Sequence, residues 1–476
     1  MKQLAQKPLF LSLLLAIILW FVFDNFVVAA SVGLLSGFMV SMLHSLHVLK
    51  TQKDVDNTQR PEVREPVSAP DNTAPENPQP TPDTGPPIQK PMTANTLPVP
   101  DSVALAHTER VSQSLLQQLQ ETFDGFMPFE HWMQHALYSP GMGYYAAGSE
   151  KLGSDIGNSD FTTAPELSPL FGQTLANQVA QILQACGART VLEFGAGSGA
   201  LAAALIPALK ALGIDPVYQI LEVSADLKAR QQARLSAPGI EVQWLNQLPR
   251  AFEGCIIANE VLDAMPVTVF EWQPNGQLAE VGVVHTGTFE MATRPASPRL
   301  QKIAADRMPA LPGYRSELNL NAEAWVTGLG DWLHRGAALL IDYGFPRREY
   351  YHPQRAEGTL MCHYRHHSHA NPLLYPGLQD ITAHVDFTAM ADAALAGGLD
   401  VLGYTSQARF LINCGLAERV AQLDTSDPVK HAQQTGAIQK LLSEAEMGEL
   451  FKVLAVGQGI DVPLKGFSQG DRRDRL

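Results

Sequence analysis

A glycine-rich turn is the part of this chain whose residue types point most directly to chemistry. Residues 191–194 are apolar except for Glu193, and Gly195, Gly197 and Gly199 follow before a run of alanines. Glycines carry no Cβ atom, so a flat ligand can approach the backbone, and they permit the positive φ angles that such a turn needs. The stretch predicts the first strand–turn–helix unit of a nucleotide-binding domain.

The turn alone leaves the identity of the nucleotide open. Gly195, Gly197 and Ala200 fit the dinucleotide fingerprint, so NAD(P) or FAD competes with S-adenosylmethionine (SAM). Glu222 closes the next apolar run, where it would hold the ribose hydroxyls of either cofactor. Glu193 favours SAM, because a carboxylate two residues before the first glycine suits an ammonium group and would repel a pyrophosphate.

Two further candidate strands also end in polar residues. The third strand is followed by residues 246–248, where a contact to the adenine edge is expected, and the buried fourth strand ends at Asn259 and Glu260. Open α/β sheets bind their ligands outside the carboxyl ends of their strands, so these groups should face one crevice. The predicted cofactor-binding residues are Glu193, Gly195, Gly197, Gly199, Glu222, Asn246, Gln247 and Leu248.

Composition excludes several other classes of protein. A net charge of -14 argues against a general nucleic-acid binder, which would usually carry a basic face. The four cysteines, at 186, 255, 362 and 414, lack paired spacing, which argues against a disulfide scaffold and favours buried, reduced thiols. The histidines at 363, 366, 367 and 369 match no zinc signature, so no metal is predicted.

The N-terminal region reads as a membrane segment. Residues 9–23 and 26–48 are almost purely apolar. Their combined length is about twice the roughly 20 residues that one span needs. A signal peptide and a single span compete with a hairpin that turns at residues 24–25. Lysines at 2, 7, 50 and 53 flank both ends and favour the hairpin, with both ends on the cytoplasmic side. We therefore expect a membrane-anchored protein whose remaining domain lies in the cytoplasm, at the inner membrane if the source is bacterial.

The composition changes sharply after this segment. Residues 51–100 hold twelve prolines and few large apolar side chains, so they cannot bury a core. The predicted organisation is a membrane hairpin over 1–50, a disordered tether over 51–103 and a folded domain over 104–476. Within that domain, residues 268–291 alternate like antiparallel strands around Asn275 and Gly276, which predicts an inserted cap over about 266–330.

Several ordered segments resemble a known family. They are residues 136–140 with 143–145, 160–172, 192–199, 259–266 and 379–387. Together they resemble the MidA/NDUFAF-seven family of SAM-dependent methyltransferases, from about residue 110 to near the C-terminus. The resemblance implies a Rossmann-like class I methyltransferase fold, with a seven-stranded sheet and additional α/β elements around the site. The N-terminal hairpin and tether are not part of the family pattern.

The resemblance also implies an activity and a partner. Mitochondrial members are implicated in methylating an arginine of the quinone-site subunit of respiratory complex I and in assembling that complex. The expected partner is therefore a protein substrate and not a nucleic acid. A SAM-binding assembly factor that holds a partner, with catalysis secondary or absent, is the alternative, because a fold alone does not separate the two.

Methylation of arginine would need carboxylates, because the guanidinium is a cation whose prior deprotonation at pH 7 costs about 9 kcal/mol. Glu260 and Asp263, with Asn259 beside them, are the first catalytic candidates. Asp263 could equally cap a helix that follows it. The weaker candidates for substrate binding are Asp160, Glu317, His384 and Asp386.

Overall fold

The computed structural model describes residues 97–148, 163–222 and 224–476, and every statement below concerns those ranges. The first described helix is α3 (Ser102–Glu121), whose N-terminus is capped by Asp101, which accepts a hydrogen bond from the Ala104 amide at 2.9 Å. Val111 and Leu115 lie on the buried face of α3 and pack against α4 (Phe129–Tyr138).

The central sheet has the strand order β15-β16-β10-β5-β2-β3-β4, with β14 beside the end of β10. Its strands are β2 (Thr190–Phe194), β3 (Val217–Leu221), β4 (Val242–Leu245), β5 (Phe252–Asn259), β10 (Leu333–Phe345), β14 (Val385–Asp386), β15 (Asp400–Ser406) and β16 (Phe451–Gln458). The strands from β10 to β4 run parallel, and β16 runs antiparallel to both of its neighbours. The chain crosses from one half of the sheet to the other next to β2, and such a switch point is where open α/β sheets bind ligands. The Rossmann-like α/β sheet predicted from the sequence is confirmed.

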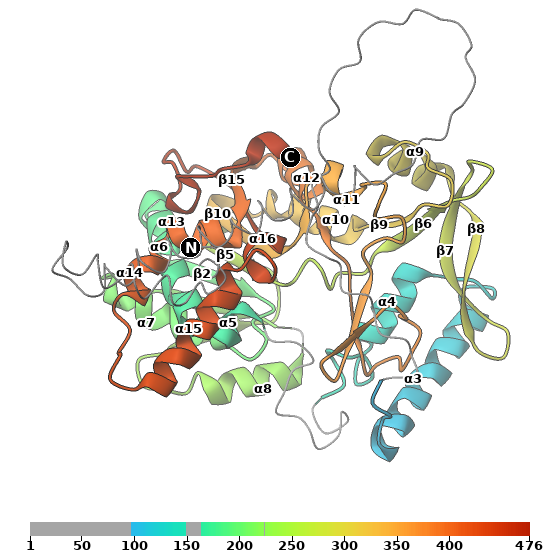
Figure 1. Ribbon diagram of the computed structural model, residues 1–476, viewed down its shortest axis with the longest axis horizontal. Helices are drawn as coiled ribbons and strands as arrows, with labels where there is room; N and C mark the ends of the chain where they lie inside the picture. The colour runs from blue at the N-terminus through green and yellow to red at the C-terminus, as the bar shows by residue number, and fades with distance from the viewer. Residues whose placement is uncertain (1–96, 149–162, 223) are drawn as a thin grey trace, which may run out of the picture. The chain divides into compact units, whose positions relative to one another are not determined.

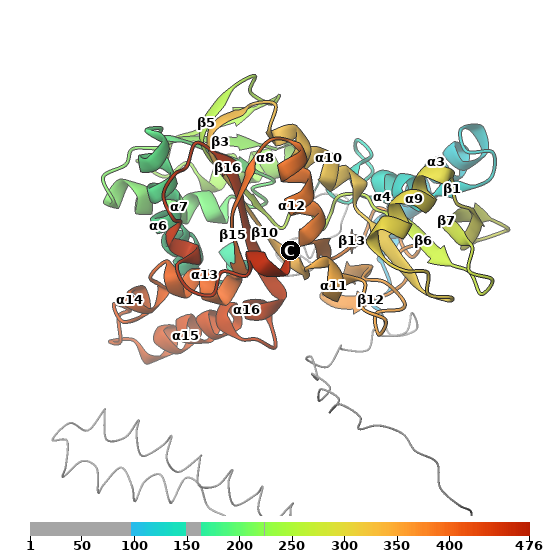
Figure 2. The same cartoon turned by 90° about the horizontal axis from the view of Figure 1, so that it is seen from above.

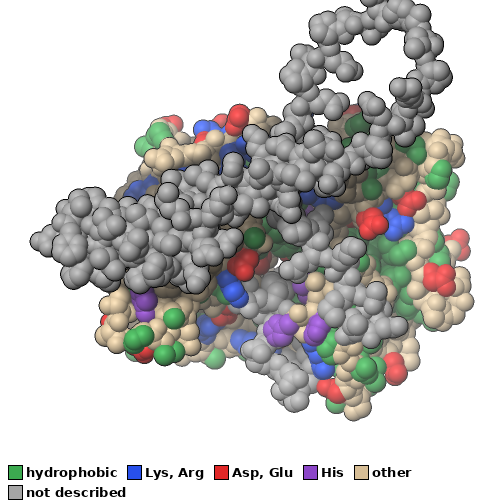
Figure 3. All heavy atoms as spheres, viewed as in Figure 1, with side chains coloured by type: hydrophobic (Ala, Val, Ile, Leu, Met, Phe, Trp, Pro, Cys, Tyr) green, Lys and Arg blue, Asp and Glu red, His purple; other side chains and the backbone are tan. Residues whose placement is uncertain are grey.

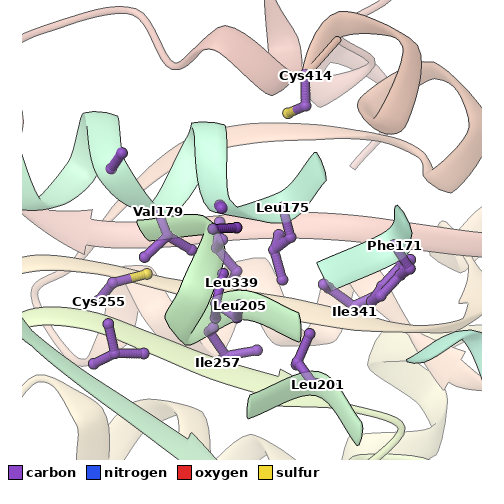
Figure 4. Packing of buried hydrophobic residues seen from close by; sticks show 14 of the residues in the cluster. Phe171, Leu175, Val179, Leu201, Leu205, Cys255, Ile257, Leu339, Ile341 and Cys414 are labelled. Atoms are coloured by element: carbon purple, nitrogen blue, oxygen red, sulfur yellow. The ribbon is translucent and has the colours of Figure 1, made fainter. Parts of the chain in front are cut away.

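Helices cover both faces of this sheet (Figures 1 and 2). One face packs against α6 (Pro169–Cys186), α7 (Ala200–Ala211) and α13 (Gln407–Asn413), and the other against α10 (Leu320–Leu329) and α12 (Phe387–Ala396). Alternation along the strands explains the two layers, because successive side chains of a strand point to opposite faces. Ile257 and Leu339 belong to the first apolar cluster, whereas their neighbours Ile256 and Leu340 belong to the second. Figure 4 shows side chains of α6 and α7 gathered over Ile257 and Leu339.

A second, antiparallel sheet lies beside the main one. It has the order β1-β7-β6-β9, with β8 paired to β7. The strands are β1 (Met127–Pro128), β6 (Thr268–Trp272), β7 (Leu278–His285), β8 (Phe289–Pro295) and β9 (Arg315–Leu318), with α9 (Pro298–Arg307) packed on them. β6 and β7 pair through a turn in which Gly276 has a φ of 79°, so the antiparallel strands predicted around Asn275 and Gly276 are confirmed.

A small third sheet, of order β12-β11-β13, completes the strands of the described part. It consists of β11 (Met361–Tyr364), β12 (His367–His369) and β13 (Asp380–Thr382). The remaining elements are α5 (Ala164–Leu167), α8 (Ala225–Arg234), α11 (Arg347–Tyr350), α14 (Leu416–Val420), α15 (Pro428–Leu442), α16 (Met447–Leu450) and the 3₁₀ turns η3 (Lys465–Phe467) and η4 (Arg473–Arg475). All four cysteines are buried and free, as their spacing predicted. On the face shown in Figure 3, basic side chains are scattered among acidic ones wherever described atoms are visible.

One part of the predicted fold class has to be corrected, namely the N-terminal transmembrane hairpin. No helix within 97–148, 163–222 and 224–476 is long and apolar enough to cross a membrane. The two longest helices, α3 and α6, carry polar side chains along their length instead of a continuous apolar surface. The segment behind the prediction, residues 1–50, and the tether up to residue 96 lie outside the described residues. The predicted membrane-anchored localisation depended on this hairpin and is therefore corrected as well.

Candidate active site

The strand register brings the predicted cofactor residues to one edge of the central sheet. Phe194, at the end of β2, pairs with Leu221 of β3 and with Ala258 of β5. Because these strands are parallel, the residues that follow them emerge side by side. The glycine turn, Glu222 and the segment that starts at Glu260 therefore lie at the same edge of the sheet.

The glycine turn has the backbone geometry that its sequence predicted. The φ angles of Gly195, Gly197 and Gly199 are 60°, 54° and 81°. A Cβ atom on Gly199 would lie 3.3 Å from the side chain of Leu235, whereas one on Gly197 would meet nothing within 4 Å. Gly199 thus permits close packing on the protein side of the turn, and Gly197 borders open space on the other side.

Glu193 lies behind this turn. Its side chain is 3% exposed, and one carboxylate oxygen accepts a hydrogen bond from the Tyr218 hydroxyl at 2.7 Å. Burial raises the pKa of the Glu193 carboxyl to about 7; the hydrogen bond from Tyr218 lowers it and the charge of Glu222 raises it. The structure places this carboxylate in the core layer, and its contact with a cofactor ammonium remains a prediction.

Glu222 directly follows β3 and is held at both oxygens. Oε1 accepts from the Ser224 amide at 2.9 Å, and Oε2 accepts from Gln231 Nε2 at 3.0 Å. A carboxylate offers about four acceptor sites, so Glu222 keeps capacity for ribose hydroxyls. Residues 246–248 form an exposed loop directly after β4.

Glu260 begins the acidic part of the site. It adopts a φ of 54°, which is uncommon outside glycine, and its amide donates to the Ile341 carbonyl at 2.8 Å. Asn259 Nδ2 donates to Glu260 Oε1 at 3.1 Å. Burial first, and then the charge of Asp263, raise the pKa of the Glu260 carboxyl to about 8.

Asp263 is fixed by a hydroxyl and by its own backbone. Its Oδ2 accepts from the Tyr343 hydroxyl at 2.8 Å, and the side chain is 3% exposed. Asp342 shapes the turn, because its Oδ2 accepts from the amides of Leu262 and Asp263 at 3.0 and 3.2 Å. Burial raises the pKa of Asp263 to about 6, against the lowering effect of Tyr343. The alternative role of Asp263 as a helix cap is wrong, since residues 262–265 form a turn and the next element is the strand β6.

Two tyrosines and the buried carboxylate of Asp380 complete this part of the site. Tyr145 donates to Asp380 Oδ1 at 2.9 Å, and Tyr138 donates to the Ala264 carbonyl at 2.9 Å. Their rings stack with centroids 5.5 Å apart and planes at 25°. Burial, then the charges of Asp380, Asp263 and Glu222, raise the pKa of Tyr138. The charges of both the predicted ribose carboxylate and the acidic residues thus act on Tyr138. We call the acidic residues the acid set: Glu260, Asp263, Asp342 and Asp380.

Of the weaker substrate-binding candidates that the structure describes, Glu317 and Asp386 have partners of their own, whereas His384 packs beside Tyr343, with ring centroids 5.0 Å apart. Glu317 is buried on Thr359, which donates to it from both its amide, at 3.0 Å, and its hydroxyl, at 2.8 Å. Asp386 caps α12 by accepting from the amide of residue 389 at 3.1 Å. His384 lies at the border of the site, and burial lowers its pKa to about 4. Asp160 lies outside the described residues.

Sequence reasoning missed four residues of this site, namely Tyr138, Tyr145, Asp342 and Asp380. Tyr138, Tyr145 and Asp380 all fall inside the segments that carry the family resemblance, and this was the one signal that could have selected them. Their proximity comes from contacts across the chain, since 235 positions separate Tyr145 from Asp380.

Comparison with known proteins defines the class to which this fold and site belong. A family described as "Putative S-adenosyl-L-methionine-dependent methyltransferase" matches residues 174–405. A Burkholderia thailandensis protein crystallised with S-adenosyl-homocysteine is 50% identical, with a TM-score of 0.76, over 80% of this chain and 100% of that chain. A second structure from the same organism is 48% identical, with a TM-score of 0.74 and the same coverage. The protein is a SAM-dependent methyltransferase.

Curated relatives narrow the class to a family. Protein arginine methyltransferase NDUFAF7, mitochondrial, of Danio rerio is 26% identical over 73% of this chain and 87% of its own length. The human protein of that name is 25% identical over 68% of this chain and 78% of its own length. The chain belongs to the MidA/NDUFAF-seven family of SAM-dependent methyltransferases, so the family predicted from its motifs is confirmed.

The residues present fit SAM. Open space at Gly197 allows close approach of the cofactor to the backbone, and Glu222 keeps acceptor capacity at the neighbouring strand end. SAM supplies a methyl group bound to a positively charged sulfur. A nucleophile attacks the methyl carbon, and the sulfur leaves. Glu260 and Asp263 follow β5, which pairs with β2, the strand that leads into the glycine turn.

Proposed function

We propose that the protein methylates an arginine side chain of a protein, and that this arginine belongs to the quinone-site subunit of a respiratory NADH dehydrogenase. The observation that carries the proposal is the acid set at the end of β5, with Tyr138 and Tyr145 beside it. Glu260 and Asp263 follow β5 and Asp380 begins β13, yet the charges of Asp263 and Asp380 act on Glu260 and on both tyrosines.

The acid set favours a cationic acceptor over a neutral one. The raised pKa values of Glu260 and Asp263, about 8 and about 6, show that ionisation is disfavoured while the site holds no positive charge. A guanidinium bound there would stabilise both carboxylates in their ionised form. Charge-assisted hydrogen bonds to such a planar cation are among the strongest in proteins. The half-buried rings of Tyr138 and Tyr145 add aromatic faces suited to a cation.

The same residues give the reaction a route for its proton. As a guanidinium nitrogen forms its bond to the methyl carbon, the carbon–sulfur bond breaks and its electron pair stays on sulfur. The nitrogen then gives up one proton, and Glu260 accepts it. Because the bound guanidinium keeps Glu260 ionised, its carboxylate can accept this proton at neutral pH. Asp263, oriented by the Tyr343 hydroxyl, holds the guanidinium during this step.

The names of the curated relatives support the arginine acceptor, since they are protein arginine methyltransferases. The choice of the quinone-site subunit extends what the family resemblance implies. A role in the assembly of the respiratory complex follows if methylation occurs before that arginine is buried.

Mass spectrometry of the quinone-site subunit tests the proposal in cells. We expect a methylated arginine with the wild-type protein, none after deletion, and none with Glu260→Gln, whose amide keeps the shape and removes the charge. Glu253→Gln is the matched control, because Glu253 is an exposed residue near the start of the same strand. An arginine of unchanged mass in wild-type and deletion cells would exclude this substrate. Normal complex assembly with Glu260→Gln, despite lost methylation, would favour a binding role over catalysis.

A further inference from the structure

Helix α8 is attached to the protein in an unusual way. Gln231 is its one fully buried residue, with an exposure of 0%, and the rest of α8 is strongly polar in composition. Helices usually pack through apolar side chains, and a buried amide is costly unless every polar atom has a partner. The contacts of Gln231 therefore indicate what this helix does.

The amide of Gln231 makes three hydrogen bonds, each 3.0 Å long. Its Nε2 donates to the Gly197 carbonyl and to Glu222 Oε2, and its Oε1 accepts from Trp244 Nε1. The orientation of the amide is determined by its partners. If the amide were flipped, its oxygen would face two acceptors and its nitrogen would face the indole donor. Among side chains of this length, glutamine alone satisfies all three partners.

These partners belong to three segments that carry predicted cofactor-binding residues. Gly197 is in the turn after β2, Glu222 follows β3, and Trp244 precedes Asn246 at the end of β4. One buried side chain therefore links three neighbouring strand ends. The close approach of Leu235, 3.3 Å from where a Cβ atom of Gly199 would lie, seats α8 against the same turn.

We propose that Gln231 is a positioning residue for the SAM ribose, which it aligns by holding the Glu222 carboxylate against the glycine turn. The proposal uses the predicted contact of Glu222 with the ribose hydroxyls. Ser224 holds Oε1 and Gln231 holds Oε2, so the carboxylate is fixed before the cofactor arrives and its remaining acceptor sites keep one direction. Without Gln231, Glu222 would keep the Ser224 hydrogen bond at Oε1 and lose the one that Gln231 donates to Oε2.

Calorimetry on the full-length protein with two ligands tests this role. The ligands are S-adenosyl-homocysteine and its 2′,3′-dideoxy analogue, which lacks the hydroxyls that Glu222 would hold. Gln231→Met should weaken S-adenosyl-homocysteine about tenfold or more, the range expected when hydrogen bonds to a charged group are lost. The same change should alter the affinity for the dideoxy analogue less than about twofold, because that ligand makes no use of the carboxylate.

Matched variants separate this role from a merely structural one. Gln232→Met makes the same substitution at the exposed neighbouring position and should bind both ligands as the wild type does. Trp244→Phe removes one partner of the Gln231 amide and should weaken S-adenosyl-homocysteine alone, by about threefold. If Gln231→Met does not fold, Trp244→Phe tests the role of Gln231 on its own. An equal loss for both ligands, or no loss for either, in the folded variants would overturn the proposal. Neither ligand depends on the identity of the methyl acceptor, so the result is independent of the arginine assignment.

Discussion

Replacing Glu260 by Gln should stabilise the ligand-free protein above neutral pH while it removes methyl transfer. The Glu260 carboxyl has a pKa of about 8 in the folded protein, against an ordinary value of 4.5. The folded state therefore holds a proton that the unfolded state releases. The contribution of this group is fully present below pH 4.5 and is lost as the pH rises towards 8. Glutamine does not ionise, so the variant avoids that loss.

The size of the effect follows from the pKa shift. A difference of 3.5 units corresponds to about 5 kcal/mol at most, at about 1.4 kcal/mol per unit. Two effects reduce this maximum. Part of the raised pKa of Glu260 comes from the charges of Asp263 and Asp380 and not from burial. The variant also loses about 1 kcal/mol of hydrogen-bond energy, because Asn259 and the backbone of Ala164 now donate to a carboxylate and would then donate to a neutral amide. We expect a net gain of about 2–3 kcal/mol at pH 8.5. For a protein of this size the gain corresponds to a rise of a few degrees in the unfolding temperature.

Thermal or urea unfolding at pH 5.0 and pH 8.5, without ligand, measures this gain. Glu260→Gln should exceed the wild type at pH 8.5 and lie close to it at pH 5.0, whereas Glu253→Gln should match the wild type at both. A variant less stable than the wild type at pH 8.5 would refute the reasoning, as would an equal difference at the two pH values. Either result would mean that the Glu260 carboxylate is already stabilised in the ligand-free site.

Three further substitutions test separate parts of the site. Gly197→Val should abolish binding of S-adenosyl-homocysteine in calorimetry, because a branched residue is strained at a φ of 54° and fills the space beside the turn. Gly197→Ala should lose less of that affinity. Equal affinity of Gly197→Val and wild type would contradict the placement of the cofactor. Tyr343→Phe should raise the pKa of Asp263 further, so methylation should fall more at pH 6.5 than at pH 8.5, and a uniform loss across that range would argue against this role. Tyr145→Phe removes one hydrogen bond to Asp380 and should raise the KM for the arginine acceptor while the affinity for S-adenosyl-homocysteine stays constant; a loss of cofactor affinity would instead place Tyr145 in the cofactor site.

The parts of the site that could be predicted are those written in contiguous sequence. The glycine turn was recognisable because its glycines, the preceding strand and the following helix lie within about a dozen residues, and Gly195 and Gly199 indeed adopt positive φ angles. Glu260 and Asp263 were selected because they directly follow a buried apolar run. Parallel strands then bring such segments to one edge of the sheet, which makes their proximity predictable without coordinates.

The remaining site residues depend on contacts that no local pattern encodes. Asp342 accepts a hydrogen bond from Leu262, which is 80 positions away in the sequence, and Tyr145 donates one to Asp380, which is 235 positions away. Gln231 lies on a helix whose polar composition suggests a solvated surface, so its complete burial was not apparent from the sequence. Glu317 was chosen by residue type alone, and the structure shows its carboxylate occupied by buried hydrogen bonds.

Transfer of a labelled methyl group from SAM to the purified quinone-site subunit tests the central claim most directly. With the full-length wild-type protein, we expect label on one arginine of the subunit, and none when that arginine is replaced by lysine. Glu260→Gln should transfer no label while it binds S-adenosyl-homocysteine with wild-type affinity. Undiminished transfer by Glu260→Gln would contradict the role of the acid set, and label on another residue type would contradict the arginine acceptor.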